Sequence, residues 1–189
     1  MKNSKLMLPL AFFLILSTIL LLFYPMQTAI AQTAQIFKSY EDPILGVSIQ
    51  YPSDWIITTE KNHIRFNPPE SYKPLPLQAF IVSVESLAPT ITSLDQYVRE
   101  KYSSSRTPDM NFSVSDSTLQ GIPAKKIVST ASEVLLSKSM DIVMIKDRTV
   151  YILDYFSGTS ATNKAEVEQH FDSLLPTAQK MIDSFKVLH

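Results

Sequence analysis

Cysteine, glycine and histidine are scarce in this sequence. The 189 residues include no cysteine, three glycines and three histidines. The lack of cysteine excludes disulfide bonds, thiolate nucleophiles, cysteine-ligated metal sites and a lipid-modified N-terminal cysteine. The glycines, Gly46, Gly121 and Gly158, lie too far apart to form a phosphate-binding loop or a dinucleotide-binding fingerprint. The sequence therefore predicts no cofactor.

The chain also has no excess of charge of one sign. Lysine and arginine total 17, aspartate and glutamate total 18, and the formal net charge is −1. A balanced charge provides no general attractive field for a polyanion. Nucleic acid is therefore not expected among the partners of this protein.

The N-terminus has the pattern of an export signal. Lys2 and Lys5 precede an apolar run over residues 6–24, and Ala29 and Ala31 form a small-x-small cleavage site. The sequence predicts a secretory signal peptide over residues 1–31 that is cleaved after Ala31. The alternative is an uncleaved transmembrane anchor, because the run approaches the roughly 20 residues that span a bilayer. In both cases the remainder is extracytoplasmic, either secreted or anchored to the outer side of the cytoplasmic membrane by residues 6–24.

Removal of residues 1–31 leaves 158 residues with a formal net charge of −3. This length suits one domain with a full hydrophobic core. Because an exported chain without cysteine has no disulfides, packing alone must stabilise the domain.

Apolar periodicity predicts an α+β domain. Ser93, with Gln96 three residues later, is typical of a helix N-cap, and Pro176 is typical of the first turn of a further helix. Residues 32–41 have the composition of a polar lead-in. The predicted helices are 93–105, 165–174 and one starting near 176, and the predicted strands are 46–51, 55–59, 63–67, 78–87, 112–118, 123–130, 134–145 and 150–156.

Short connections determine the expected strand pairing. The turn after Tyr51 predicts that strand 55–59 returns along strand 46–51, and turns at Gly121 and at Asp147 predict an antiparallel meander of the last three strands. Strand 150–156 is apolar on both faces, so it is expected at the centre of the sheet. Helices are expected on both faces of a twisted antiparallel sheet.

Several segments also resemble, in the same order, the members of a known family. Residues 40–43 and 46–55 are similar to the opening strands of PsbP-like proteins, and the similarity continues at 94–98, 119–126, 150–155 and 181–186. The resemblance covers residues 37–188 and rests on core and turn residues. It implies a PsbP-like α-β-α sandwich with a central antiparallel sheet, and it specifies a fold rather than a chemistry.

The resemblance has limited implications for function. The family includes non-catalytic extrinsic subunits of the photosynthetic water-oxidising complex, a nuclear Ran-binding protein shares its fold, and many prokaryotic members are exported with no assigned function. This chain has a short signal rather than a transit peptide rich in serine and arginine, so neither a photosystem role nor its metal-linked residues are carried over. The chain is expected to be a prokaryotic exported member.

Four side chains are candidates for ligand binding. His63 and Arg65 share the outer face of a predicted strand, where they form either an anion-binding pair or an ordinary exposed polar face. Trp55 either lines a ligand pocket or anchors the core, and the second interpretation is favoured. Asp154 interrupts an apolar strand, and a buried carboxyl must be paired or protonated.

Two interpretations of Asp154 remain open. It can act as a general acid or base, or it can form a structural pair with Lys126 or Lys138 of a neighbouring strand. The structural pair is favoured, and a position at the rim of the sheet is a further alternative.

Loop and turn carboxylates are the candidates for a metal site. Asp54, Asp109 and Asp116 can supply the oxygen ligands that calcium prefers. Asn111 opens an Asn-x-Ser sequon and is a candidate glycosylation site in an exported chain.

These observations favour a non-enzymatic accessory or docking module, associated with a protein partner at or near a membrane complex or the cell surface. The alternative is a soluble exported domain that binds a small ligand or a divalent cation such as calcium. A hydrolase is disfavoured, because a nucleophile, a base and oxyanion donors cannot be assembled from the sequence.

Overall fold

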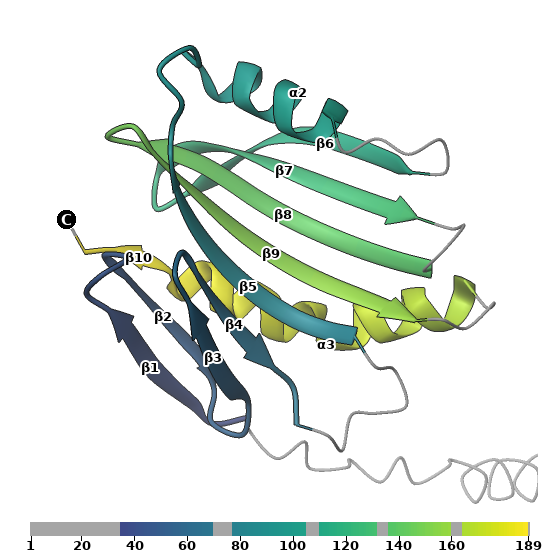
Figure 1. The fold of residues 1–189 in the computed structure, drawn as a ribbon. Helices are drawn as coiled ribbons and strands as arrows, with labels where there is room; N and C mark the ends of the chain where they lie inside the picture. Colours follow the sequence, from purple (N-terminus) through teal and green to yellow (C-terminus); the bar gives the residue numbers. More distant parts are fainter. Residues whose placement is uncertain (1–34, 70–76, 105–109, 132–135, 160–163, 189) are drawn as a thin grey trace, which may run out of the picture. The chain divides into compact units, whose positions relative to one another are not determined.

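The computed structural model describes residues 35–69, 77–104, 110–131, 136–159 and 164–188 (Figure 1). All of them belong to one compact unit, Gln35–His189. The predicted signal or anchor segment, residues 1–31, lies outside the described residues. Within the described ranges, no helix is both long enough and apolar enough to cross a membrane.

The described part is an α+β fold of two antiparallel sheets and two helices. In chain order the elements are β1 (Phe37–Asp42), β2 (Val47–Pro52), β3 (Ile56–Glu60), β4 (His63–Asn67), β5 (Leu77–Ser86), α2 (Leu94–Ser104), β6 (Asn111–Leu119), β7 (Ile122–Ala131), β8 (Leu136–Lys146), β9 (Thr149–Thr159), α3 (Lys164–Ser184) and β10 (Lys186–Val187).

The larger sheet has seven strands in the order β3-β4-β5-β9-β8-β7-β6. The predicted meander of β7, β8 and β9 is confirmed, and so is the central position of β9. Gln120 and Gly121 both have positive φ, as do Asp147 and Arg148, so two-residue turns of the kind that matches strand twist connect these hairpins.

Each face of the large sheet packs against one helix, as predicted (Figure 1). On one face, Phe171, Met181 and Ile182 of α3 pack against buried residues of β8 and β9. On the other face, Tyr97 and Val98 of α2 pack over β7, β8 and β9. Ser93 caps α2, because its Oγ accepts a hydrogen bond from the backbone N–H of Gln96 at 3.1 Å.

Tyr155 connects the central strand to α3 by a buried hydrogen bond. The side chain is fully buried, its ring packs 4.7 Å from that of Phe171, and its hydroxyl donates to the Phe171 carbonyl oxygen at 2.9 Å. Tyr155→Phe keeps the ring and leaves this carbonyl oxygen without its side-chain donor. We expect the free energy of unfolding to fall by about 1–2 kcal/mol, measured by urea denaturation. An unchanged value would show that the hydroxyl bond contributes nothing net.

The predicted hairpin of residues 46–51 and 55–59 is wrong. β2 pairs with β1 and β10 in a separate three-stranded sheet, and β3 pairs with β4 in the large sheet. The predicted polar lead-in contains β1, which the sequence pattern did not reveal. The only aromatic residues of β1, Phe37 and Tyr40, are three positions apart, so they lack the spacing of two that marks one face of a strand.

The predicted helix start at Pro176 is also wrong, because α3 continues through this residue. Proline has no N–H to donate to the carbonyl of Asp172, and this loss usually ends or bends a helix. Here Phe171 and Leu174 before the proline and Ala178 and Met181 after it are all buried in the same core. Packing of one continuous apolar stripe therefore outweighs the lost hydrogen bond.

Candidate functional site

Two carboxyl groups lie side by side at the centre of the face that α2 covers. Asp141 of β8 is directly opposite Asp154 of β9, and the two side chains share a hydrogen bond. Tyr102 of α2 donates its hydroxyl hydrogen to Oδ2 of Asp141 at 2.5 Å. Oδ1 of Asp154 is buried and has no hydrogen-bond partner among the described residues. We refer to Asp141 and Asp154 as the carboxyl pair.

The carboxyl pair is arranged to retain a proton. Burial and the adjacent Asp141 carboxylate raise the pKa of Asp154 well above its usual value, although the charge of Arg65 opposes this shift. Burial also raises the pKa of Asp141, but hydrogen bonds from Tyr102 and Asp154 favour its charged form. Asp154 is therefore the protonated member and donates to Asp141.

A second polar contact joins α2 to the sheet. The Tyr97 hydroxyl donates to Oε1 of Glu85 on β5, and Nζ of Lys101 lies 3.1 and 3.2 Å from the two Glu85 carboxylate oxygens. Together with Tyr102 and Asp141, these side chains tie one helix to strands β5 and β8. The orientation of α2 on the sheet therefore depends on two carboxylates as well as on apolar packing.

This geometry favours a structural anchor over a metal centre. Within the described part of the chain, no three acidic or histidine side chains are clustered as metal ligands. The shared proton and the hydrogen bond from Tyr102 reduce the repulsion between the two carboxyl groups without a cation, and Oδ1 of Asp154 keeps no hydrogen-bond partner among the described residues.

The predicted pairing of Asp154 with Lys126 or Lys138 is wrong, because both lysines lie on the opposite face of the sheet. Lys126 is opposite Ile142, and Lys138 is opposite Ser157. Each lysine lies an odd number of residues from the row of the sheet that contains Asp141 and Asp154, so its side chain points to the other face. Nζ of Lys138 instead lies 3.4 Å from Asp172 of α3. Side chains alternate along a strand, so the register decides which face a lysine reaches.

His63 and Arg65 share one half-buried face, as predicted, and it is the face of the carboxyl pair. Nε2 of His63 lies 3.4 Å from Glu60, and Nε of Arg65 donates to Asn67 at 2.8 Å. Arg65 and Asp154 lie in one row of the sheet, separated by Ile81 of β5. The anion-binding role of His63 and Arg65 stays a prediction.

Trp55 is 4% exposed and belongs to the main core, which fits the interpretation as a core anchor. Asp54 precedes β3 at one edge of the large sheet, and Asp116 lies on β6 at the other edge, so these two carboxylates do not form a joint site. Asp109 lies outside the described residues. Asn111 is exposed at the start of β6, and its glycosylation stays a prediction.

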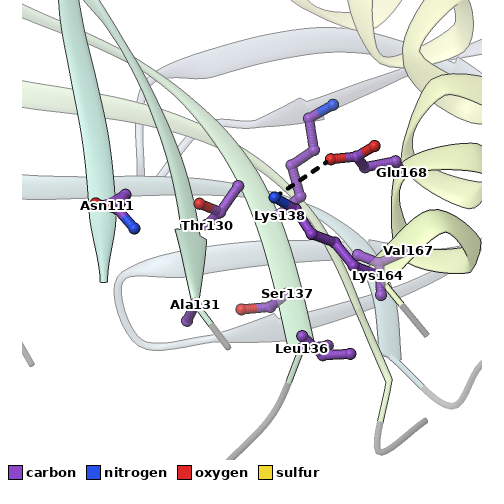
Figure 2. A pocket seen from close by; sticks show the side chains of 9 residues that line it. All are labelled: Asn111, Thr130, Ala131, Leu136, Ser137, Lys138, Lys164, Val167 and Glu168. Carbon is purple, nitrogen blue, oxygen red and sulfur yellow. Dashed lines mark ion pairs between the residues drawn. The ribbon is translucent and has the colours of Figure 1, made fainter. Parts of the chain in front are cut away.

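Two hollows lie where the large sheet meets α3. The smaller, about 80 Å³, lies between the ends of β6, β7 and β8 and the start of α3, where Lys164 and Glu168 form an ion pair at 3.9 Å (Figure 2). It has room for a few water molecules only. The larger, about 510 Å³, lies between the β6–β7 hairpin and the C-terminal end of α3. This larger hollow, which we call the α3 groove, is of a size that suits a ligand or a few side chains.

The strand that borders the α3 groove has an open edge. Among the residues that the structure describes, β6 pairs with β7 alone and ends the seven-stranded sheet. It is nine residues long and largely exposed, with Val114 45% exposed, whereas β3 at the opposite edge has five residues. An edge strand of this length carries unpaired backbone groups that can bind another chain.

Sequence reasoning did not single out Asp141 or Tyr102. Asp141 interrupts an apolar run, Met140 to Met144, in the same way as Asp154 interrupts its own strand, so a signal was present. Tyr102 lies on the apolar stripe of a helix, and its hydroxyl could not be given a partner before the packing of α2 was known.

Comparison with known proteins gives matches of structure only. No family model matches the sequence, and no curated protein matches it. The chain resembles a crystal structure from Bacteroides thetaiotaomicron with 14% identity and a TM-score of 0.51 over 79% of this chain. The match covers 48% of that protein, so this chain spans about half its length.

Two further structures match over nearly their whole length. The yeast Ran-binding protein Mog1p, from Saccharomyces cerevisiae, has 10% identity and a TM-score of 0.57, covering 82% of this chain and 97% of Mog1p. The cyanobacterial PsbP of Synechocystis sp. PCC 6803, CyanoP, has 13% identity and a TM-score of 0.53, covering 86% of this chain and 99% of CyanoP. The described part of this chain therefore has the α+β fold of CyanoP and Mog1p, as the sequence resemblance predicted.

Proposed function

We propose that this chain is an exported, non-catalytic docking module of the PsbP-like family, which binds a protein partner at or near the outer side of the cytoplasmic membrane. The observation that carries the proposal is the open, nine-residue edge of β6. Backbone groups at such an edge bind extended segments of other proteins by adding a strand to the sheet.

The export part of the proposal rests on the N-terminal sequence. Two lysines, an apolar run over residues 6–24 and the Ala29-x-Ala31 site favour delivery across the cytoplasmic membrane. If the segment stays uncleaved, the ten residues 25–34 between the run and the domain reach at most about 35 Å. Retention of the anchor would then keep the domain close to the bilayer surface.

Position-specific crosslinking in the native cells tests the proposal. A photo-crosslinking amino acid at Val114 of β6 is expected to yield a discrete adduct with one membrane-fraction protein. The matched control is Thr58 of β3, which is exposed at the opposite edge on the same face of the sheet. We expect the adduct to be several-fold stronger from Val114. Equal yields from both edges, or no adduct at Val114, would contradict docking at β6.

The volume of the α3 groove supports a second candidate, a small-ligand or divalent-cation binding domain. About 510 Å³ lies within the range of sites for small molecules. Thermal unfolding of the full chain with calcium chloride and with small organic acids distinguishes this candidate from a docking module. A rise in Tm that saturates at micromolar ligand would favour it, whereas a Tm unaffected up to millimolar ligand would exclude it for the compounds used.

A further inference from the structure

The open edge of β6 has a defined set of outward-facing backbone groups. Leu119 and Ile122 flank a two-residue turn, so their backbone groups bond to each other across the hairpin. The direction of the backbone groups alternates along an antiparallel strand. The N–H and C=O groups of Val114, Asp116 and Thr118 therefore point away from β7, toward the open edge.

The two sides of this edge differ in chemistry. On the face that α2 covers, the edge presents the apolar side chain of Val114 and the carboxylate of Asp116. Nζ of Lys125 lies 2.6 Å from Asp116 and also 2.6 Å from Asp95 of α2. Asp116, the only charged side chain of β6, is thus already paired with a lysine. A further carboxylate on this face would be repelled by Asp116 and Asp95. An added strand would fit here with apolar side chains.

On the other face, the edge opens into the α3 groove. Ser115 and Ser117 point to this face, and Ser117 lines the groove with a small side chain. Lys126 of β7 lies opposite Ser115, and Lys186 of β10 also lines the groove. Adjacent strands are about 5 Å apart, so a lysine side chain on β7 can reach over a serine toward the next strand position.

The charge of the α3 groove favours a carboxylate. Neither Lys126 nor Lys186 forms an ion pair with any residue that the structure describes, and neither ammonium group donates a hydrogen bond to one of these residues. Asp183, the acidic residue of the groove, accepts a hydrogen bond from Gln179 at 2.8 Å. Two ammonium groups beside one engaged carboxylate provide a net positive potential next to the open strand edge.

We propose that the β6 edge binds an extended segment of a partner protein as an eighth strand, with acidic side chains directed into the α3 groove and apolar side chains alternating toward Val114. The backbone bonds of the edge supply affinity, while Lys126 and Lys186 select the alternating pattern. This inference rests on the proposed docking function and adds the chemistry of the partner.

Two nine-residue fluorescent peptides test this pattern, one alternating valine with glutamate and one alternating valine with lysine. Fluorescence anisotropy with the full chain in non-ionic detergent is expected to show at least tenfold tighter binding of the glutamate peptide. The double variant Lys126→Glu, Lys186→Glu is expected to reverse this preference. The double variant Lys38→Glu, Lys61→Glu, at exposed positions of β1 and of the turn between β3 and β4, changes the net charge by the same amount and is expected to leave the preference unchanged.

A backbone variant tests the strand addition itself. Val114→Pro removes an outward N–H without removing one that bonds to β7, so binding of both peptides is expected to be lost. Circular dichroism measures whether the variant is folded. If it is not folded, the charge-reversal variants still test the proposal through their peptide preference. Binding that ignores the charge reversal, or equal binding of both peptides to the unmodified chain, would overturn the proposal.

The remaining outcomes separate this inference from the docking function. If the chain sediments as a dimer and Val114→Pro makes it monomeric, a second copy occupies the edge and the acidic-strand proposal is wrong. If neither peptide binds while the Val114 crosslink persists, docking at β6 stands and the partner chemistry is wrong. If the crosslink is also absent, both proposals fail.

Discussion

Replacement of Asp154 by asparagine is expected to stabilise the protein above neutral pH and to flatten the dependence of stability on pH. Burial and Asp141 raise the pKa of Asp154 in the folded state, so folding retains a proton that the unfolded chain releases. The contribution of Asp154 to the free energy of unfolding is therefore fully present below the pKa of the unfolded chain, near 4. As the pH rises above that value, this contribution falls by about 1.4 kcal/mol per pH unit until the pKa of the folded state is passed.

Asparagine reproduces the protonated form of Asp154 without titrating. Its amide N–H can donate to Asp141 as the carboxyl proton does, and its carbonyl oxygen can occupy the position of the unpartnered Oδ1. At pH 8 we expect the free energy of unfolding of Asp154→Asn to exceed that of the unmodified chain by about 1 kcal/mol or more.

Urea denaturation between pH 4 and pH 9 measures this effect. Asp54→Asn is the matched control, because Asp54 is an exposed turn residue and the substitution should leave the pH dependence of the chain unchanged. A variant Asp154→Asn that is less stable at every pH, with the original slope, would show that Asp154 is ionised in the folded protein and that the assignment of the proton is wrong.

Phe66→Ala is expected to lower the free energy of unfolding severely, and by much more than truncation of a half-buried phenylalanine. Phe66 is fully buried, and its ring centroid lies 6.0 Å from that of Tyr40, 5.3 Å from that of Tyr51 and 6.4 Å from that of Phe80. Tyr40 and Tyr51 belong to the small sheet, whereas Phe66 and Phe80 belong to the large sheet. Truncation would leave a cavity where the two sheets pack together, at an expected cost of about 3–5 kcal/mol.

Phe156→Ala is the matched control for this truncation. Phe156 is half-buried on β9 and belongs to neither of the two core clusters, so removal of its ring should cost about 1 kcal/mol. Equilibrium denaturation in urea measures both variants. Equal losses would mean that the contact between the two sheets does not depend on Phe66.

Much of the fold was predictable because it depends on local pattern. The strand at 63–67 matches β4, and the apolar content of both faces of strand 150–156 correctly placed β9 at the centre of the sheet. The errors lie where distant contacts decide. β1 carries a weak pattern of its own and forms by pairing with β2, and α3 passes through Pro176 because its apolar stripe packs on one sheet face.

The candidate site was only partly predictable. A carboxyl in an apolar strand identified Asp154 as a residue that must be paired or protonated, and the structure meets that demand with Asp141 rather than with a lysine. A shift of register by one residue moves every side chain of a strand to the other face. The partner of Asp154 was therefore undetermined until the pairing of β8 with β9 was known.

The α3 groove and the open edge lay beyond sequence reasoning for the same reason. Residues 112–118 were recognised as a strand, but strand pattern does not say which strands end a sheet. The edge position of β6 follows from the order of the large sheet, and the groove follows from the packing of α3 beside the β6–β7 hairpin.

The sequence by itself determined the local elements of this protein: the turns at Gly121 and Asp147, the alternating strands, the capped helix α2 and the need for Asp154 to be neutralised. These depend on residues that are close together in the chain, where spacing and conformational preference act directly. Only the tertiary structure decided that Asp154 shares a proton with Asp141, that β2 belongs to a separate sheet and that β6 has an open edge. Each depends on which strands become neighbours, and this is decided by packing between segments far apart in the chain.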